Sequence, residues 1–160
     1  MSSNYQPPAG WAPPGAQFRT SGNFSRTALG TLVSVVVTPI GIGLAAKGAL
    51  DTRQWVIVGS AGDRWGSNGQ IIGGALLLFL VALSAAYAPA GTVIAGLVWG
   101  LLPGVMQIVS PEDTWRLIDE SSVLSPELRL AVHNWVLGGF ALVIGLMLIA
   151  AGIAATLRRR

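Results

Sequence analysis

The chain has 160 residues, of which 52% are hydrophobic and only 11% are charged. Soluble domains carry about 25% charged residues, so this composition excludes a soluble globular enzyme, a disordered chain and a coiled coil. Mean hydropathy is +0.61, which together with the low charge predicts a multi-pass membrane protein. The chain lacks cysteine, which excludes disulfides, thiolate metal sites and iron–sulfur clusters.

The N-terminal segment is rich in proline and glycine and contains the pairs Pro7-Pro8 and Pro13-Pro14. Such a segment cannot bury enough apolar surface to offset the entropy lost on ordering. We therefore expect residues 1–27 to form a disordered cytoplasmic tail. A polyproline ligand for a partner domain is the alternative interpretation.

Residues 28–160 are expected to form one membrane domain, in which long apolar segments alternate with polar connections. A hydrocarbon core of about 30 Å requires about 20 helical residues. Because backbone groups cannot stay unpaired in lipid, apolar segments of this length must be helices. The sequence therefore predicts an all-α membrane protein, a four-transmembrane-helix antiparallel bundle with spans at residues 28–50, 71–88, 91–109 and 131–157.

Two longer connections, residues 51–70 and 110–130, are expected on the outer side. The first contains Trp-Val-Ile-Val at residues 55–58, which predicts a brief extended segment, and a turn at residues 67–69. The second begins with Ser110-Pro111 and two acids, which predicts a short interfacial helix between helices three and four. Ser125-Pro126 repeats this pattern, so the fourth helix is expected to start there and to run to Leu157, about 48 Å in length.

Four spans place both termini on one side of the membrane. Basic residues are equally numerous on the two sides, so the three consecutive arginines after the last span decide the expected orientation: Arg158, Arg159 and Arg160. We expect both termini in the cytoplasm, and a bacterial plasma membrane, because nine arginines to one lysine is typical of coding by a high-G+C genome. An outer interfacial belt is expected from Trp55, Trp65, Trp115 and Trp135.

Small residues recur along two of the predicted spans. They allow helix backbones to approach closely, which is the main packing determinant in lipid. We expect them to pack either inside the bundle or against a partner; they are Gly96, Gly100 and Gly104 in the third span and Gly138, Gly145 and Gly152 in the fourth. Pro39 and Pro103 are expected to bend the first and third spans.

The residues available for chemistry are few. His133 is the one histidine, which excludes a bis-histidine haem site and a multi-histidine metal site. A hydrogen-bonded interfacial histidine is the main interpretation, and a proton acceptor in an outward-facing enzyme site is the alternative. No carboxylate lies inside a span, which argues against an ion pathway. We expect no catalytic residue, metal or cofactor and no nucleic-acid binding.

These features favour a non-catalytic accessory subunit of a larger plasma-membrane complex, of respiratory, transport or envelope-assembly machinery. Its expected partners are other integral membrane proteins and lipids. The alternative is a small transporter or lipid-handling protein that acts alone or as a homo-oligomer. That alternative requires a cavity between the first and third spans at Pro39 and Pro103.

Overall fold

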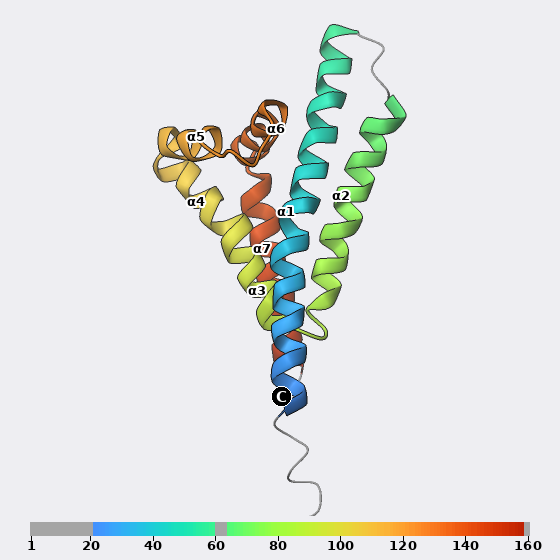
Figure 1. The fold of residues 1–160 in the computed structure, drawn as a ribbon, viewed down its shortest axis with the longest axis vertical. Helices are drawn as coiled ribbons and strands as arrows, with labels where there is room; N and C mark the ends of the chain where they lie inside the picture. Colours follow the sequence, from blue (N-terminus) through green and yellow to red (C-terminus); the bar gives the residue numbers. More distant parts are fainter. Residues whose placement is uncertain (1–20, 60–63, 159–160) are drawn as a thin grey trace, which may run out of the picture.

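The computed structural model describes residues 21–59 and 64–158, apart from the side chains of residues 21–26 and 58. The expected tail up to residue 20, and Arg159 and Arg160, lie outside the described residues. The described chain is all-helical (Figure 1), with the elements α1 Ser21–Val58, α2 Arg64–Ser84, α3 Pro89–Gly96, η2 Leu97–Leu101, α4 Leu102–Val109, α5 Pro111–Asp119, α6 Pro126–Leu137 and α7 Phe140–Leu157.

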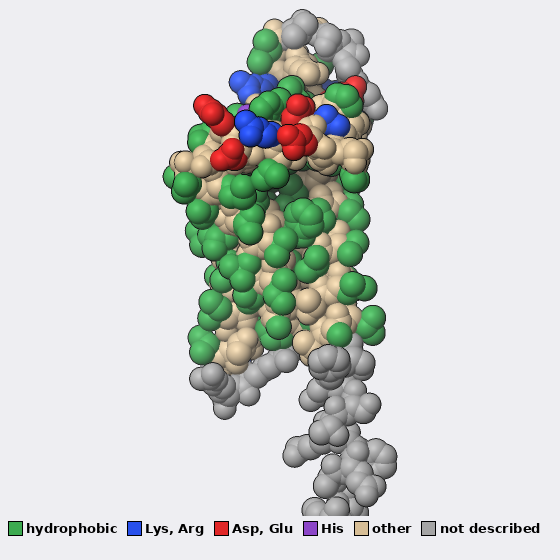
Figure 2. Space-filling model, turned by 60° about the vertical axis from the view of Figure 1, so that its left-hand side comes forward, with side chains coloured by type: hydrophobic (Ala, Val, Ile, Leu, Met, Phe, Trp, Pro, Cys, Tyr) green, Lys and Arg blue, Asp and Glu red, His purple; other side chains and the backbone are tan. Residues whose placement is uncertain are grey.

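Four helical stretches of the described chain are long and apolar enough to cross a membrane, which supports the prediction of a multi-pass membrane protein. They are Thr27–Ile57, Arg64–Ser84, Pro89–Val109 and Phe140–Leu157. Figure 2 shows acidic and basic side chains gathered in a band near one end of the molecule, above a body covered by hydrophobic side chains. The band contains charged residues of α5 and α6, among them Glu112, Asp119 and Arg129.

The helices α1 and α2 form a hairpin that extends past the other elements at one end (Figure 1). α1 begins at Ser21, inside the expected tail, and it continues through residues 55–58, where we expected an extended segment. Gly59 ends the helix with a φ of 64°, and its N–H donates to the carbonyl of Trp55 at 3.0 Å. The Arg64 guanidinium at the start of α2 lies 4.7 Å from the Trp55 ring centre, which joins the two helix ends. Helix continuation therefore overrides the local β propensity of this segment.

The third membrane-crossing stretch is a continuous helical segment made of α3, η2 and α4. Its middle, Leu97–Leu101, is a π-helical turn directly before Pro103. Proline cannot donate a hydrogen bond to the carbonyl four residues earlier, and its ring crowds that turn. The wider π turn accommodates this misfit, so Pro103 changes the helix geometry without ending the helix.

The fourth predicted helix is two helices, which corrects the expectation of one rod from Pro126 to Leu157. α6 begins where the sequence indicated, and the Ser125 hydroxyl accepts a hydrogen bond from the backbone N–H of Leu128 at 3.3 Å. α6 ends at Leu137, Gly138 caps it, and Gly139 has a left-handed φ of 75° that glycine adopts without strain. The 18 residues of α7 span about 27 Å, close to the thickness of a hydrocarbon core. α6 lies across the end of the molecule (Figure 1).

Glycines bring the third stretch into close contact with α7. A Cβ atom on Gly100 would overlap the Cα of Gly145, and one on Gly145 would lie 2.5 Å from the backbone nitrogen of Leu101. Similar approaches occur along the same interface at Gly96, Gly104 and Gly152. Gly138 lies at the α6–α7 junction beside the Phe140 ring. The expected small-residue seams of these two spans thus lie largely against each other inside the protein.

The close approach at Gly100 gives a test of the fold. Replacing Gly100 by Val places a side chain against the backbone of Gly145 and pushes the two helices apart, so we expect a loss of about 1–3 kcal/mol of unfolding free energy. The matched control is Gly73→Val on α2, because a Cβ there would meet no atom within 4 Å. Equilibrium unfolding in mixed micelles measures both variants, and equal losses would contradict this packing.

Candidate functional site

An apolar cavity of about 360 Å³ lies among α1, the η2–α4 segment, α5, α6 and α7. Every residue that lines it is uncharged: Pro39, Ile42, Gly43, Val98, Trp99, Leu102, Pro103, Met106, Thr114, Leu117, Ile118, Ser121, Leu124, Leu128, Val132, Trp135, Val136 and Ala141. Pro39 and Pro103, the two prolines expected to bend their spans, are among them. The cavity therefore lies where the alternative hypothesis of a transporter or lipid-handling protein requires one.

A hydrogen bond between the first and third spans fixes one wall of the cavity. Pro39 has no N–H to donate to the carbonyl of Val35, four residues earlier in α1. The indole Nε1 of Trp99 in the π turn donates to that same carbonyl at 2.8 Å. In lipid an unpaired carbonyl is costly, so Trp99 supplies the donor that Pro39 lacks.

A cluster of buried hydroxyl groups joins the first three spans next to this hydrogen bond in α1. Ser34, Thr38 and Thr92 are fully buried. Thr38 donates to the Ser34 carbonyl at 2.6 Å, and the hydroxyls of Ser34 and Ser84 lie 3.2 Å apart. Ser84 and Thr92 both donate to the carbonyl of Val81, at 2.6 and 3.4 Å. These bonds connect α1, α2 and α3 through satisfied polar groups.

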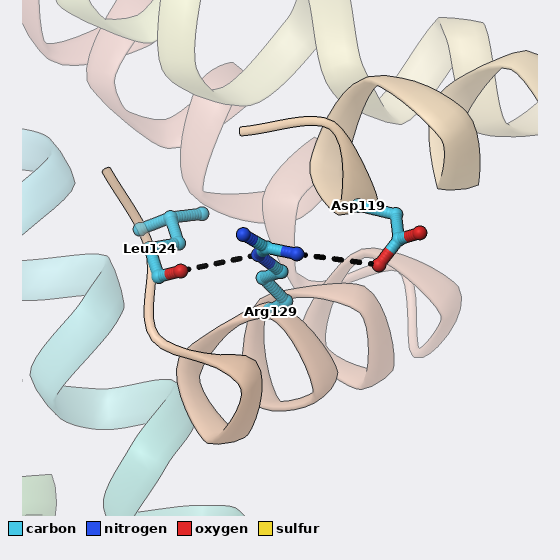
Figure 3. A network of polar contacts seen from close by, with 3 residues as sticks. All are labelled: Asp119, Leu124 and Arg129. Carbon is cyan, nitrogen blue, oxygen red and sulfur yellow. Dashed lines mark hydrogen bonds and ion pairs between the residues drawn. The ribbon is translucent and has the colours of Figure 1, made fainter. Parts of the chain in front are cut away.

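Helices α5 and α6, which we call the roof, cover the cavity at its charged end. Figure 3 shows how Arg129 of α6 holds the two helices together. Its Nε donates to the carbonyl of Leu124 at 3.1 Å, and its Nη1 donates to Oδ1 of Asp119 at 3.5 Å. Lys47 and Glu127, whose charged atoms lie 3.7 Å apart, connect the roof to α1. The Lys47–Glu127 pair thus connects the roof to the first span. The side chains of the roof that line the cavity are uncharged.

Trp135 lies in the cavity wall, although we expected it in an outer aromatic belt. Its Nε1 is buried without a hydrogen-bond partner among the described residues. Its ring centre lies 5.0 Å from that of Phe140. Of the other tryptophans expected in the belt, Trp55 contacts Arg64, Trp65 is 85% exposed, and Trp115 packs against His133. Arg158 follows α7 at the opposite end of the molecule.

His133 lies on α6 outside the apolar cavity. Its ring packs edge-on against Trp115, with ring centres 4.5 Å apart. Burial lowers the pKa of His133, so the imidazole is neutral at neutral pH. Its Nδ1 is buried without a partner among the described residues. His133 therefore belongs to a different pocket from the one that the prolines line.

Comparison of the chain with protein-family models, with curated proteins and with solved structures found no match.

Several site residues were not predicted from the sequence. The hydroxyls of Ser84 and Thr92 had no pattern that distinguishes them from other serines and threonines in spans. Gly138 is expected from the sequence to be part of a packing seam, whereas the pair Gly138-Gly139 also favours a helix break. The pairing of Trp99 with the Pro39 turn joins positions 64 residues apart in sequence, which no local pattern reveals.

The Trp99 hydrogen bond predicts a coupling between two positions. Trp99→Phe leaves the Val35 carbonyl without a donor, so we expect it to cost about 1–3 kcal/mol of unfolding free energy. Alanine at position 39 would restore the missing N–H, so the same Trp99→Phe change should cost less in the Pro39→Ala background. A double-mutant cycle measured by unfolding in mixed micelles gives the coupling. An equal cost of Trp99→Phe in both backgrounds would refute it.

Proposed function

We propose that the protein is a lipid-handling membrane protein that binds an apolar chain, such as a lipid acyl chain, in the cavity beneath α5 and α6. The single observation that carries this proposal is the apolar cavity between Pro39 and Pro103. Its volume of about 360 Å³ falls within the range of small-molecule sites. Its uncharged lining suits a hydrocarbon better than an ion or a polar solute.

The distribution of charge supports the placement in the membrane that this proposal assumes. Hydrophobic side chains cover the body of the molecule below the charged band (Figure 2). Large hydrophobic side chains that are exposed in the described chain include Leu32, Leu76 and Leu146. In the proposed arrangement the four spans form an antiparallel bundle in a bacterial plasma membrane. α5 is then an interfacial helix on the outer surface, and the end of α7 with its arginines lies in the cytoplasm.

The glycines of the third stretch and of α7 also favour this proposal over a docking subunit. Seams that could have bound a partner helix are occupied within the protein, for example at Gly100 and Gly145. These contacts close one side of the molecule with backbone against backbone. The cavity remains above them, where α4, α5 and α6 meet.

A substitution that fills the cavity tests the proposal. Gly43 lines the cavity, and a Cβ there would meet only Leu128 Cδ1, at 3.8 Å, so Gly43→Leu places its side chain in the cavity with little strain. We expect crosslinks from a photoactivatable acyl chain to Met106 and Val132 to fall at least about fivefold, the ratio that corresponds to about 1 kcal/mol of overpacking.

Crosslinks to Phe79 serve as the internal control, because this side chain faces outward and is 58% exposed. They should stay unchanged in Gly43→Leu, which confirms that the variant is inserted and surrounded by lipid. Crosslinks to Met106 that persist at the wild-type level would exclude an acyl chain in the cavity.

A second candidate function, the accessory subunit, is favoured by the outer face of α2. Gly69 and Gly73 form a G-x-x-x-G spacing, and a Cβ on either would meet no atom within 4 Å. The exposed Leu76 and Leu80 continue the same helix face. Among the glycine pairs described above, this one lies open to a neighbouring helix, which would belong to another integral membrane protein.

The accessory-subunit hypothesis predicts an effect of Gly73→Leu on assembly and not on folding. We expect this variant to keep its unfolding midpoint, because the position is open, and to lose a co-purified membrane protein that the wild type retains in native mass spectrometry. The matched variant Gly43→Leu, which alters the cavity, should retain that partner. A wild-type protein that is monomeric in several mild detergents would contradict the hypothesis.

A further inference from the structure

A second pocket, of about 480 Å³, lies on a different face of α5 from the apolar cavity. The α5 residues 114, 117 and 118 face the cavity, whereas residues 112, 115, 116 and 119 border the second pocket. Each set follows the spacing of one helix face. We call this the His133 pocket; the residues that matter to its chemistry are Gln107, Glu112, Trp115, Arg116, Asp119 and His133.

Two buried atoms in this pocket have no hydrogen-bond partner among the described residues. They are Oε1 of Gln107 and Nδ1 of His133. Buried polar atoms are almost always paired, so two orphans that border one pocket indicate a missing partner. The Gln107 oxygen can only accept a hydrogen bond. A neutral imidazole has one accepting nitrogen, and with the proton on Nε2 that nitrogen is Nδ1. A single ligand that pairs with both atoms must then carry more than one N–H or O–H.

The charged groups that border the pocket suit a ligand that carries both a positive and a negative group. Asp119 is already paired with Arg129, so the Glu112 carboxylate and the Arg116 guanidinium remain, one charge of each sign. Within the described residues Glu112 and Arg116 form no ion pair, whereas Asp119 is shared with Arg129 at 3.5 Å. No group of three or more metal-ligating side chains occurs among the described residues, so an organic cation fits better than a metal ion.

We propose that the His133 pocket binds a primary ammonium group joined to a phosphate, as in the headgroup of an ethanolamine phospholipid. The ammonium has three N–H donors, enough for Gln107, the histidine and the Glu112 carboxylate. Trp115 adds an aromatic ring next to the cation. Arg116 is the partner for the phosphate. A quaternary ammonium lacks N–H groups and would leave both orphan atoms unpaired.

This inference rests on the proposed position of α5 at the membrane surface and not on the contents of the apolar cavity. The test uses the full chain in nanodiscs that contain either phosphatidylethanolamine or phosphatidylcholine, with retained lipid counted by native mass spectrometry. We expect the wild type to retain the ethanolamine lipid about tenfold better, because hydrogen bonds to a charged group are strong. Gln107→Leu and Glu112→Gln should each remove most of this preference.

Two matched controls separate headgroup binding from general effects. Gln70→Leu removes another buried, unpartnered amide oxygen, on α2 outside the pocket, and should keep the preference. Glu120→Gln removes an exposed carboxylate that does not line the pocket and should also keep it. Gln107→Leu should not lower the unfolding midpoint of the lipid-free protein, since it removes an unsatisfied polar atom. A purely structural role for Gln107 would predict the opposite.

A further arm distinguishes a lipid headgroup from a soluble amine. Phosphoethanolamine added to phosphatidylcholine nanodiscs should bind and depend on Gln107 and Glu112, which would assign the pocket to this chemical group. Equal retention of the two lipids together with no binding of phosphoethanolamine would overturn the proposal, as would a preference that Gln107→Leu leaves intact. Gly43→Leu alters the apolar cavity and not the His133 pocket, so it should keep the preference for the ethanolamine lipid. A failure of the cavity proposal can therefore be distinguished from a failure of the headgroup proposal.

Discussion

The hydrogen bond from Trp99 to the carbonyl of Val35 is the constraint on which the rest of this structure depends. A proline in a membrane span leaves one carbonyl without its helical donor, and lipid provides no water to replace it. The donor comes from the third span, and this hydrogen bond therefore fixes the position of that span along the axis of α1. The π turn that contains Trp99 is itself matched to Pro103. The two prolines are therefore linked through one indole, and both face the apolar cavity.

The cavity follows from an uneven distribution of small side chains along the spans. Gly100 and Gly145 bring backbones into contact, and the hydroxyls of Ser34 and Ser84 connect α1 and α2. Nearer the charged end the third stretch carries larger side chains such as Leu102, and α4 diverges from α1 there (Figure 1). The roof fills only part of the resulting space. Tight packing at one level and a cavity at another are thus two results of the same sequence pattern.

The sequence predicted the class of fold from composition and span length, because apolar segments of about 20 residues have few alternatives in lipid. It also located the start of α6, since Ser125-Pro126 is a local cap. The break at Gly139 was missed because glycine in a span favours close packing as much as it favours a turn. The pairing of Trp99 with the Pro39 turn, and the gathering of Gln107 and His133 in one pocket, depend on tertiary contacts that no local pattern contains.

The break at Gly139 explains why both proposed sites lie at the same end of the molecule. An unbroken helix from Pro126 to Leu157 would be about 48 Å long, well beyond a core of about 30 Å. Ending α6 before Gly139 leaves 18 residues to cross the membrane and frees α6 to lie across the helix ends beside α5. In this position α5 and α6 turn one face toward the uncharged side chains that line the cavity. Their charged residues lie on the opposite, solvent-facing side. The apolar cavity beneath these helices and the His133 pocket beside them, which we propose as hydrocarbon and headgroup sites, both follow from fitting this chain to the thickness of a bilayer.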